Sequence, residues 1–261
     1  MKTRIITALI GLIIVLPIII YGNLPFIIVA FLLAIVGLFE LIRMYKPDQI
    51  SIYLMFSVLF LISLIFPNET ISIGSLSLNK GDILLVFSIF LLSLTVFTKN
   101  KFTFNDAGFL LITTLYIGLS FNYLIDIRLA GLNYLLFILF IIWSTDSGAY
   151  FFGKAFGKKK LWPEISPNKT IGGAIGGIIA AIIISIVFQL VFPFDFSMLT
   201  TILYALLISI VGQVGDLVAS AFKRHYDIKD AGKLFPGHGG VLDRLDSLIF
   251  VLLVLSIIQF V

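Results

Sequence analysis

The sequence predicts an all-α integral membrane protein with about nine transmembrane helices. Its 261 residues are 60% hydrophobic and only 12% charged, whereas soluble domains are about 45–50% apolar and about 25% charged. Apolar stretches near the length of about 20 residues that crosses a bilayer as a helix recur along the chain. We therefore expect a single polytopic membrane domain over residues 1–261, with N-terminal spans in about 1–126 and the functional spans and loops in about 130–261.

Nine apolar stretches, separated by polar, glycine or proline residues, are the candidate spans. They cover about 5–21, 25–42, 51–66, 82–98, 107–125, 130–152, 171–192, 197–221 and 245–261. The first follows Lys2 and Arg4 and imitates a signal peptide, but no small-residue cleavage site comes after it. We expect it to be retained as a membrane span.

The distribution of basic residues predicts the orientation in the membrane. With nine spans and a cytoplasmic N-terminus, sixteen Lys and Arg residues face the inner side, and only Lys80 and Arg128 face the outer side. Basic residues accumulate on the cytoplasmic side of membrane proteins. We therefore expect a multi-pass protein of the cell membrane, with its N-terminus in the cytoplasm and its C-terminus outside. This topology explains the net charge of +4 without a nucleic-acid partner.

Two long inner loops, Gly153–Thr170 and Phe222–Arg244, carry most of the polar motifs. The segment 220–246 is the most polar part of the chain and adjoins apolar runs on both sides. Charges at the edge of a bilayer are costly and usually mark a site. We therefore expect an active site on the cytoplasmic face. Because the chain has no cysteine, thiolate metal sites and a cysteine nucleophile are excluded.

Three aspartates near the inner ends of the last two spans are candidate metal ligands. Asp216 lies late in the eighth span, whereas Asp243 and Asp246 lie three apart at the start of the ninth. Mg²⁺ prefers carboxylate, water and phosphate oxygens, so the three predict a magnesium site if these spans pack together. Asp146, late in the sixth span, is a further polar candidate. Each aspartate taken singly also fits a structural ion pair with a nearby Lys or Arg.

Candidate anion-binding groups lie in both inner loops. Gly239 and Gly240 follow His238 in a turn whose backbone N–H groups are able to form an anion nest. Lys169 and Thr170 open the seventh span, where a helix N-terminus favours phosphate. The paired glycines at 172–177 instead match the small-residue spacing of close helix packing in lipid.

The segment 220–246 resembles the signature of the phosphatidate cytidylyltransferase (CDP-diacylglycerol synthase) family. That signature reads S-x-x-K-R, four residues, K-D-x-G, and then H-G-G-x-x-D-R-x-D. The residues that meet it are Ser220, Lys223, Arg224, Lys229, Asp230, Gly232, His238, Gly239, Gly240, Asp243, Arg244 and Asp246. Residues 146–150, Gly157 and 166–170 are also similar to the family, as is the layout of spans, so the resemblance covers essentially the whole chain.

The resemblance implies that CTP and phosphatidic acid give CDP-diacylglycerol and pyrophosphate, with Mg²⁺ as cofactor and a second cation allowed. It implies catalytic roles for Asp216, Lys223, Arg224, Asp243 and Asp246, the three aspartates holding the metal. It implies substrate binding by Ser166, Lys169, Thr170, Ser220, Lys229, Asp230, His238, Gly239, Gly240 and Arg244. The bilayer is the expected environment, and a homodimer is an assembly that the sequence allows.

Two positions depart from the family pattern. Gly172 and Ala219 stand where family members usually carry acidic residues. A catalytically weakened or inactive relative is therefore one alternative. An ion-coupled transporter is the other, because Asp146 and Asp216 lie within apolar spans; their position near the inner ends of the spans argues against it.

Overall fold

The computed structural model describes residues 2–65, 70–73, 76–232, 234 and 239–261. Its helices are α1 (Lys2–Tyr21), α2 (Asn23–Tyr45), the short 3-10 helix η1 (Pro47–Gln49), α3 (Ile50–Ile65), α4 (Lys80–Phe97), α5 (Phe104–Ala130), α6 (Leu132–Phe156), α7 (Ile171–Val191), α8 (Met198–His225) and α9 (Leu242–Ile257). Two antiparallel hairpins join them, β1 (Thr70–Ile73) with β2 (Leu76–Asn79) and β3 (Lys160–Trp162) with β4 (Ser166–Thr170). The predicted helical class is confirmed, whereas the two hairpins were not predicted.

Seven helical segments in the described part of the chain are long and apolar enough to cross a membrane. They are α2, η1 with α3, α4, α5, α6, α7 and α8. Helix α9 has only 16 residues, which is short for a span of about 20 residues. An integral membrane protein is therefore confirmed, whereas crossing by α1 and α9 stays a prediction.

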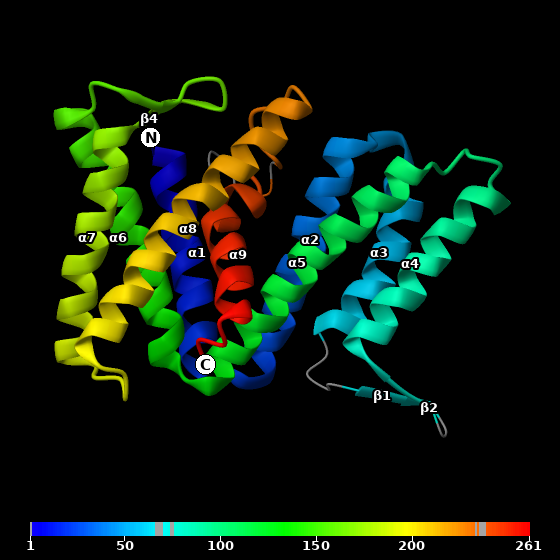
Figure 1. Cartoon of the computed structure of the whole chain (residues 1–261), viewed down its shortest axis with the longest axis horizontal. Helices are drawn as coiled ribbons and strands as arrows, with labels where there is room; N and C mark the ends of the chain where they lie inside the picture. Colours follow the sequence, from blue (N-terminus) through cyan, green and yellow to red (C-terminus); the bar gives the residue numbers. More distant parts are fainter. Residues whose placement is uncertain (1, 66–69, 74–75, 233, 235–238) are drawn as a thin grey trace.

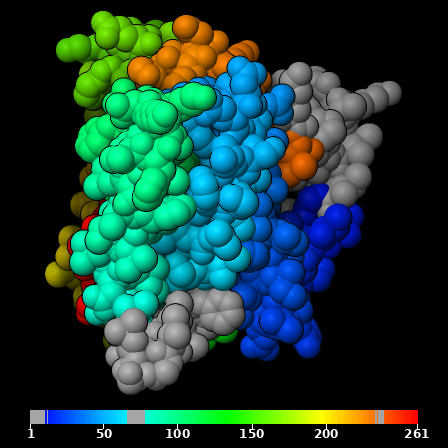
Figure 2. All heavy atoms as spheres, turned by 90° about the vertical axis from the view of Figure 1, so that its right-hand side faces the viewer, coloured from blue at the N-terminus to red at the C-terminus, as the bar shows by residue number. Residues whose placement is uncertain are grey.

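The helices stand side by side, with α5, α8 and α9 between an α6–α7 pair and an α3–α4 pair (Figure 1). One end of the bundle carries the β3–β4 hairpin and the C-terminal end of α8, and the opposite end carries β1–β2 and the chain's C-terminus. Figure 2, turned by 90°, again places the yellow-green and orange segments together at one end. The fold thus gathers the polar segments at one end of the bundle, as expected if both lie on the same side of the membrane.

Helix α5 is the buried centre of the first half of the bundle and packs against α2, α3 and α9. Its start is fixed by the fully buried Asp106, which forms a capping box with Thr103. The Asp106 carboxylate also accepts a hydrogen bond from the Tyr45 hydroxyl and pairs with Lys46 Nζ, each at 2.7 Å. Because a buried charge is tolerated only when it is paired and hydrogen-bonded, these contacts bind the end of α2 to the start of α5.

Helices α6 and α7 approach so closely that glycine is required between them. A Cβ atom at Gly148 would lie 2.8 Å from the carbonyl oxygen of Gly176 and 3.2 Å from Cα of Gly177. A Cβ atom at Gly177 would lie 2.8 Å from the carbonyl oxygen of Thr145. The prediction that the paired glycines serve close helix packing is therefore confirmed.

Helix α8 is longer than the sequence predicted. It continues to His225, so Lys223 and Arg224 lie on its last turn rather than in a loop. The predicted boundary followed the end of the apolar run, but a helix whose final turn leaves the apolar layer can carry charged residues there. Basic residues also interact favourably with the negative end of the helix dipole. Their helical placement fixes Lys223 relative to Asp216 and Ser220.

We predict that Gly177→Ala lowers the free energy of unfolding by about 1–3 kcal/mol, because its methyl group would overpack the α6–α7 contact. Gly108→Ala on α5 is the control, since a Cβ atom there meets nothing within 4 Å, and alanine stabilises an open helical site by about 0.5–1 kcal/mol. Thermal unfolding of both variants in detergent measures the difference. Equal unfolding temperatures would contradict the packing assignment.

Candidate active site

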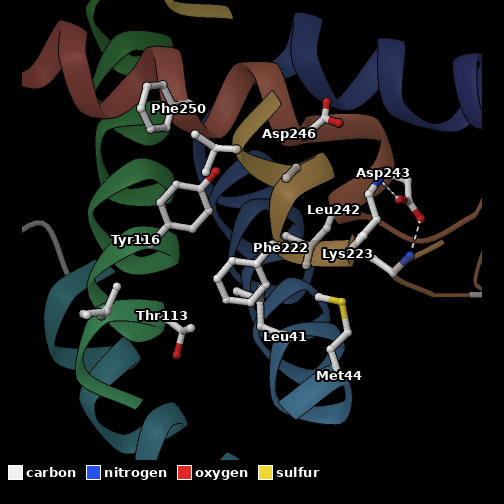
Figure 3. Close-up of a pocket in the computed structure, with 14 residues that line it drawn as sticks. Leu41, Met44, Thr113, Tyr116, Phe222, Lys223, Leu242, Asp243, Asp246 and Phe250 are labelled. Carbon is white, nitrogen blue, oxygen red and sulfur yellow. Dashed lines mark hydrogen bonds and ion pairs between the residues drawn. The ribbon is translucent and has the colours of Figure 1, made fainter. Parts of the chain in front are cut away.

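Helices α8 and α9 pack on each other and bring the two halves of the polar segment together (Figure 1). Lys223 Nζ lies 2.7 Å from Asp243 Oδ1, and the side chains are only 14% and 7% exposed. Figure 3 shows this ion pair at the edge of a hollow. An ion pair shielded from water interacts more strongly than one on the surface, so it fixes the end of α8 against the start of α9.

Asp243 also closes the loop between these helices. Its Oδ2 atom accepts hydrogen bonds from the backbone N–H groups of Ala231, at 2.8 Å, and Gly240, at 2.9 Å. Gly239 has a φ of +86°, and a Cβ atom there would overlap the Asp243 carboxylate. Glycine is therefore needed at 239 both for the left-handed backbone conformation and for space.

Glu40, on α2, is a positioning residue that the sequence analysis missed. It is 3% exposed, and its two carboxylate oxygens accept hydrogen bonds from the N–H groups of Val241 and Leu242, each at 2.9 Å. The N-cap of α9 has no side-chain cap of its own, so Glu40 serves as that cap from another helix. A Cβ atom at Gly232 or Gly240 would overlap the Glu40 carboxylate.

A signal for Glu40 was present in the sequence. It is the one acidic residue in the predicted second span, about 25–42, and a charge inside an apolar span marks a site by default. Its partners are backbone N–H groups some two hundred residues away in the chain, which no local pattern reveals. Glu40 also accounts for two of the glycines in the signature.

A second ion pair joins β4 to α8. Lys169 pairs with Asp216, and its Nζ atom also lies 3.4 Å from the carbonyl oxygen of Gln213. The first polar inner loop is therefore in direct contact with a candidate metal ligand of the eighth predicted span. The sequence left open that each candidate aspartate forms a structural ion pair instead of binding a metal. Asp216 and Asp243 both form such a pair here.

Three carboxylates from different helices lie close enough for their charges to interact. The charges of Asp146 on α6 and Asp216 on α8 both act on Asp246 on α9. Asp243 stands apart from them, engaged with Lys223 and the loop. Within the described residues, no group of three or more acidic or histidine side chains is compact enough to hold a metal ion. The magnesium site therefore stays a prediction.

The other candidate residues are distributed around these contacts. Thr170 is buried, and its hydroxyl caps α7 by accepting a hydrogen bond from Gly173 N–H at 3.1 Å. Ser166 pairs with Trp162 in the β3–β4 hairpin, and Ser220 lies one turn from Lys223 on α8. The exposed candidates are Arg224, Lys229, Asp230 and Arg244. His238 lies outside the described residues.

The two departures from the family pattern occupy different places. Gly172 lies at the start of α7 against the end of α6, where a Cβ atom would be 3.2 Å from the carbonyl oxygen of Phe156. Ala219 lies on α8 and lines a cavity of about 160 Å³ together with Lys223, Asp243 and Asp246. Only the change at Ala219 therefore alters the side chains that surround this cavity.

The fold and site define a membrane protein with cations and carboxylates gathered at one end of its helices, which is a suitable arrangement for phosphate chemistry. The chain belongs to the cytidylyltransferase family, whose model matches residues 2–261. It is 45% identical over 255 residues to the phosphatidate cytidylyltransferase of Bacillus subtilis, covering 97% of this chain and 95% of the relative. It is 45% identical over 258 residues to that of Staphylococcus epidermidis and 42% identical over 258 residues to that of Staphylococcus aureus, covering 99% of this chain and 98% of each relative.

We predict that Glu40→Ala destabilises the protein strongly, because it leaves the N–H groups of Val241 and Leu242 buried without an acceptor, at about 1–3 kcal/mol each. Glu164→Ala is the control, since Glu164 is exposed in the turn between β3 and β4. Thermal unfolding in detergent and proteolysis of the 226–241 loop measure the effect. The cap assignment is wrong if both variants unfold and are cleaved alike.

Proposed function

We propose that this chain transfers a cytidylyl group from CTP to phosphatidic acid, giving CDP-diacylglycerol and pyrophosphate in phospholipid biosynthesis. The observation that carries the proposal is the similarity to phosphatidate cytidylyltransferases over nearly the whole chain. The geometry supports it, because the signature residues of α8, the following loop and α9 converge through Lys223, Asp243 and Glu40.

The reaction is a displacement at the α-phosphorus of CTP. A phosphate oxygen of phosphatidic acid forms a bond to that phosphorus, and the bond to the bridging oxygen of the β-phosphate breaks, so pyrophosphate leaves with its electron pair. The attacking phosphate is already anionic at neutral pH, so no strong general base is needed. The task of the protein is to hold two polyanions in line, which positioning and cationic groups achieve.

The carboxylates are suited to Mg²⁺, which proteins usually bind through one or two carboxylates together with water and substrate phosphate oxygens. Asp216 and Asp246 supply such a pair from neighbouring helices, with Asp146 near enough to act on both. Mg²⁺ bound there would neutralise charge on the triphosphate. As a ligand, Asp243 would have to release Lys223. The roles of Asp243 and of a second cation stay predictions.

The cations of the site are proposed to bind phosphate groups. Lys223 and Arg224 occupy the last turn of α8, and Arg224 is exposed, with Nη1 3.4 Å from the carbonyl oxygen of Ile228. Arginine stays charged and its planar fork suits phosphate oxygens. Lys169 would exchange its contact with Asp216 for a substrate phosphate when the carboxylate takes up a cation. Lys229, Asp230, Ser220 and Arg244 are candidates for further contacts with CTP.

The topology completes the proposal. Nine spans with a cytoplasmic N-terminus and an outer C-terminus, as the sequence predicts, would put the site on the cytoplasmic face of the cell membrane, where CTP is available. The position of the β3–β4 hairpin and the end of α8 at one end of the bundle supports this orientation, as does the excess of basic residues on the expected inner side. A homodimer stays a prediction.

We predict that the purified protein in detergent forms CDP-diacylglycerol from CTP and phosphatidic acid and that chelation of Mg²⁺ abolishes turnover. Asp246→Asn should lower kcat/KM by about a hundredfold or more, because a neutral amide holds a divalent cation poorly. Asp227→Asn is the matched control: Asp227 is exposed, with a φ of 53°, a conformation that asparagine also adopts readily.

The product is measured by lipid extraction after reaction with labelled CTP. Near-normal turnover by Asp246→Asn would remove that residue from the site. Binding of CTP by the wild-type protein without product would instead identify a catalytically inactive relative, to which the changes at Gly172 and Ala219 would point. Ion flux in sealed vesicles without nucleotide would favour a transporter.

A further inference from the structure

We propose that the hollow between α5 and α8 is the binding site for the acyl chains of the lipid substrate and that Val218 and Ile112 form its walls. The inference rests on the proposed function, since phosphatidic acid is the lipid in question. It adds where the lipid lies, between which helices it enters, and which side chains set its chain preference.

The hollow consists of two adjoining parts. The inner part, of about 160 Å³, is bounded by α2, α5, α8 and α9 and ends at Lys223, Asp243 and Asp246. The outer part, of about 460 Å³, runs along α5 and α8 towards His225 and Tyr226. The residues that line both parts are Ile112, Thr113, Val218 and Phe222. Because they share these walls, the two parts form one hollow that runs from the charged site to the end of α8.

This hollow exists because of how three helices pack. Helices α5 and α8 each pack on α9 and lie farther from each other, although the rings of Phe109 on α5 and Phe222 on α8 approach to 6.3 Å between their centroids. In Figure 1, α9 lies between them. Two apolar side chains that line both parts reach the surface between these helices, since Ile112 is 67% exposed and Val218 is 37% exposed. In the proposed site, a lipid would enter past these two exposed apolar side chains.

The lining fits an amphiphile with an anionic head. In Figure 3 the apolar side chains of Leu41, Tyr116 and Phe222 lie to one side, and the Lys223–Asp243 pair lies to the other. The Tyr116 hydroxyl has no hydrogen-bond partner among the described residues, although its ring lines the inner part. It is available to donate to an ester carbonyl oxygen, while Lys223 meets the phosphate. The groups thus follow the order phosphate, ester and acyl chain.

The test uses tryptophan to fill the hollow. Val218→Trp places an indole where both parts meet, and Ile112→Trp does so from the opposite wall. Val214→Trp is the matched control, one turn earlier on α8; Val214 is 41% exposed, close to the 37% of Val218, and lines neither part. Each variant is assayed with dioleoyl and with dihexanoyl phosphatidic acid at saturating CTP, in the same detergent.

The expected result is a change in chain selectivity. Each buried methylene strengthens binding about fourfold, so displacing two or more should lower the ratio of kcat/KM for dioleoyl over dihexanoyl phosphatidic acid by about tenfold or more. Both Val218→Trp and Ile112→Trp should show this loss, and Val214→Trp should keep the wild-type ratio. An unchanged ratio in the first two variants, or the same change in all three, would overturn the proposal.

A second readout separates this proposal from the proposed function. Phosphatidic acid with a photoreactive group in its acyl chain is crosslinked to the wild-type protein, and the labelled peptides are identified by mass spectrometry. Labelling of α5 and α8 at the hollow supports the lipid site even if no CDP-lipid forms, in which case only the proposed reaction fails. Labelling confined to other helices, with turnover intact, refutes the lipid site alone.

Discussion

Helix α9 begins inside the molecule, and its first backbone N–H groups must find acceptors there. Glu40 accepts from Val241 and Leu242, and Asp243 accepts from Gly240 and Ala231. Four buried donors are thus satisfied by two carboxylates, one from α2 and one from α9 itself. Because an unsatisfied buried N–H group is costly, these bonds fix the loop, and through Asp243 they also fix Lys223 at the end of α8.

Two ion pairs join cations and carboxylates of the site. Lys169 pairs with Asp216 and Lys223 pairs with Asp243, so two of the cations proposed for phosphate are held by carboxylates proposed for metal binding. A divalent cation arriving with a triphosphate offers each member of a pair a new partner of opposite charge. The exchange keeps these four charges paired at the edge of the membrane, where an isolated charge is costly.

Most of the helices were predictable, and the candidate residues could be chosen from the sequence, because both follow from local patterns. Apolar runs gave the helices, and the spacing from Ser220 to Asp246 gave the candidate residues. Several features were not predictable. The continuation of α8 to His225 lies beyond the apolar run, Thr170 serves as a helix cap, and Glu40 acts on N–H groups distant in the chain. Each depends on what a residue meets in space.

The sequence by itself determined that the chain is a helical membrane protein of the cytidylyltransferase family, because apolar composition and motif spacing do not depend on how helices are arranged. The tertiary structure decided which charges pair, which glycines carry no side chain because another residue fills the space, and where a hollow remains. The separation of α5 from α8 by α9 leaves that hollow beside Lys223. The packing of the three helices sets the distance between α5 and α8, and no single segment of the sequence encodes that distance.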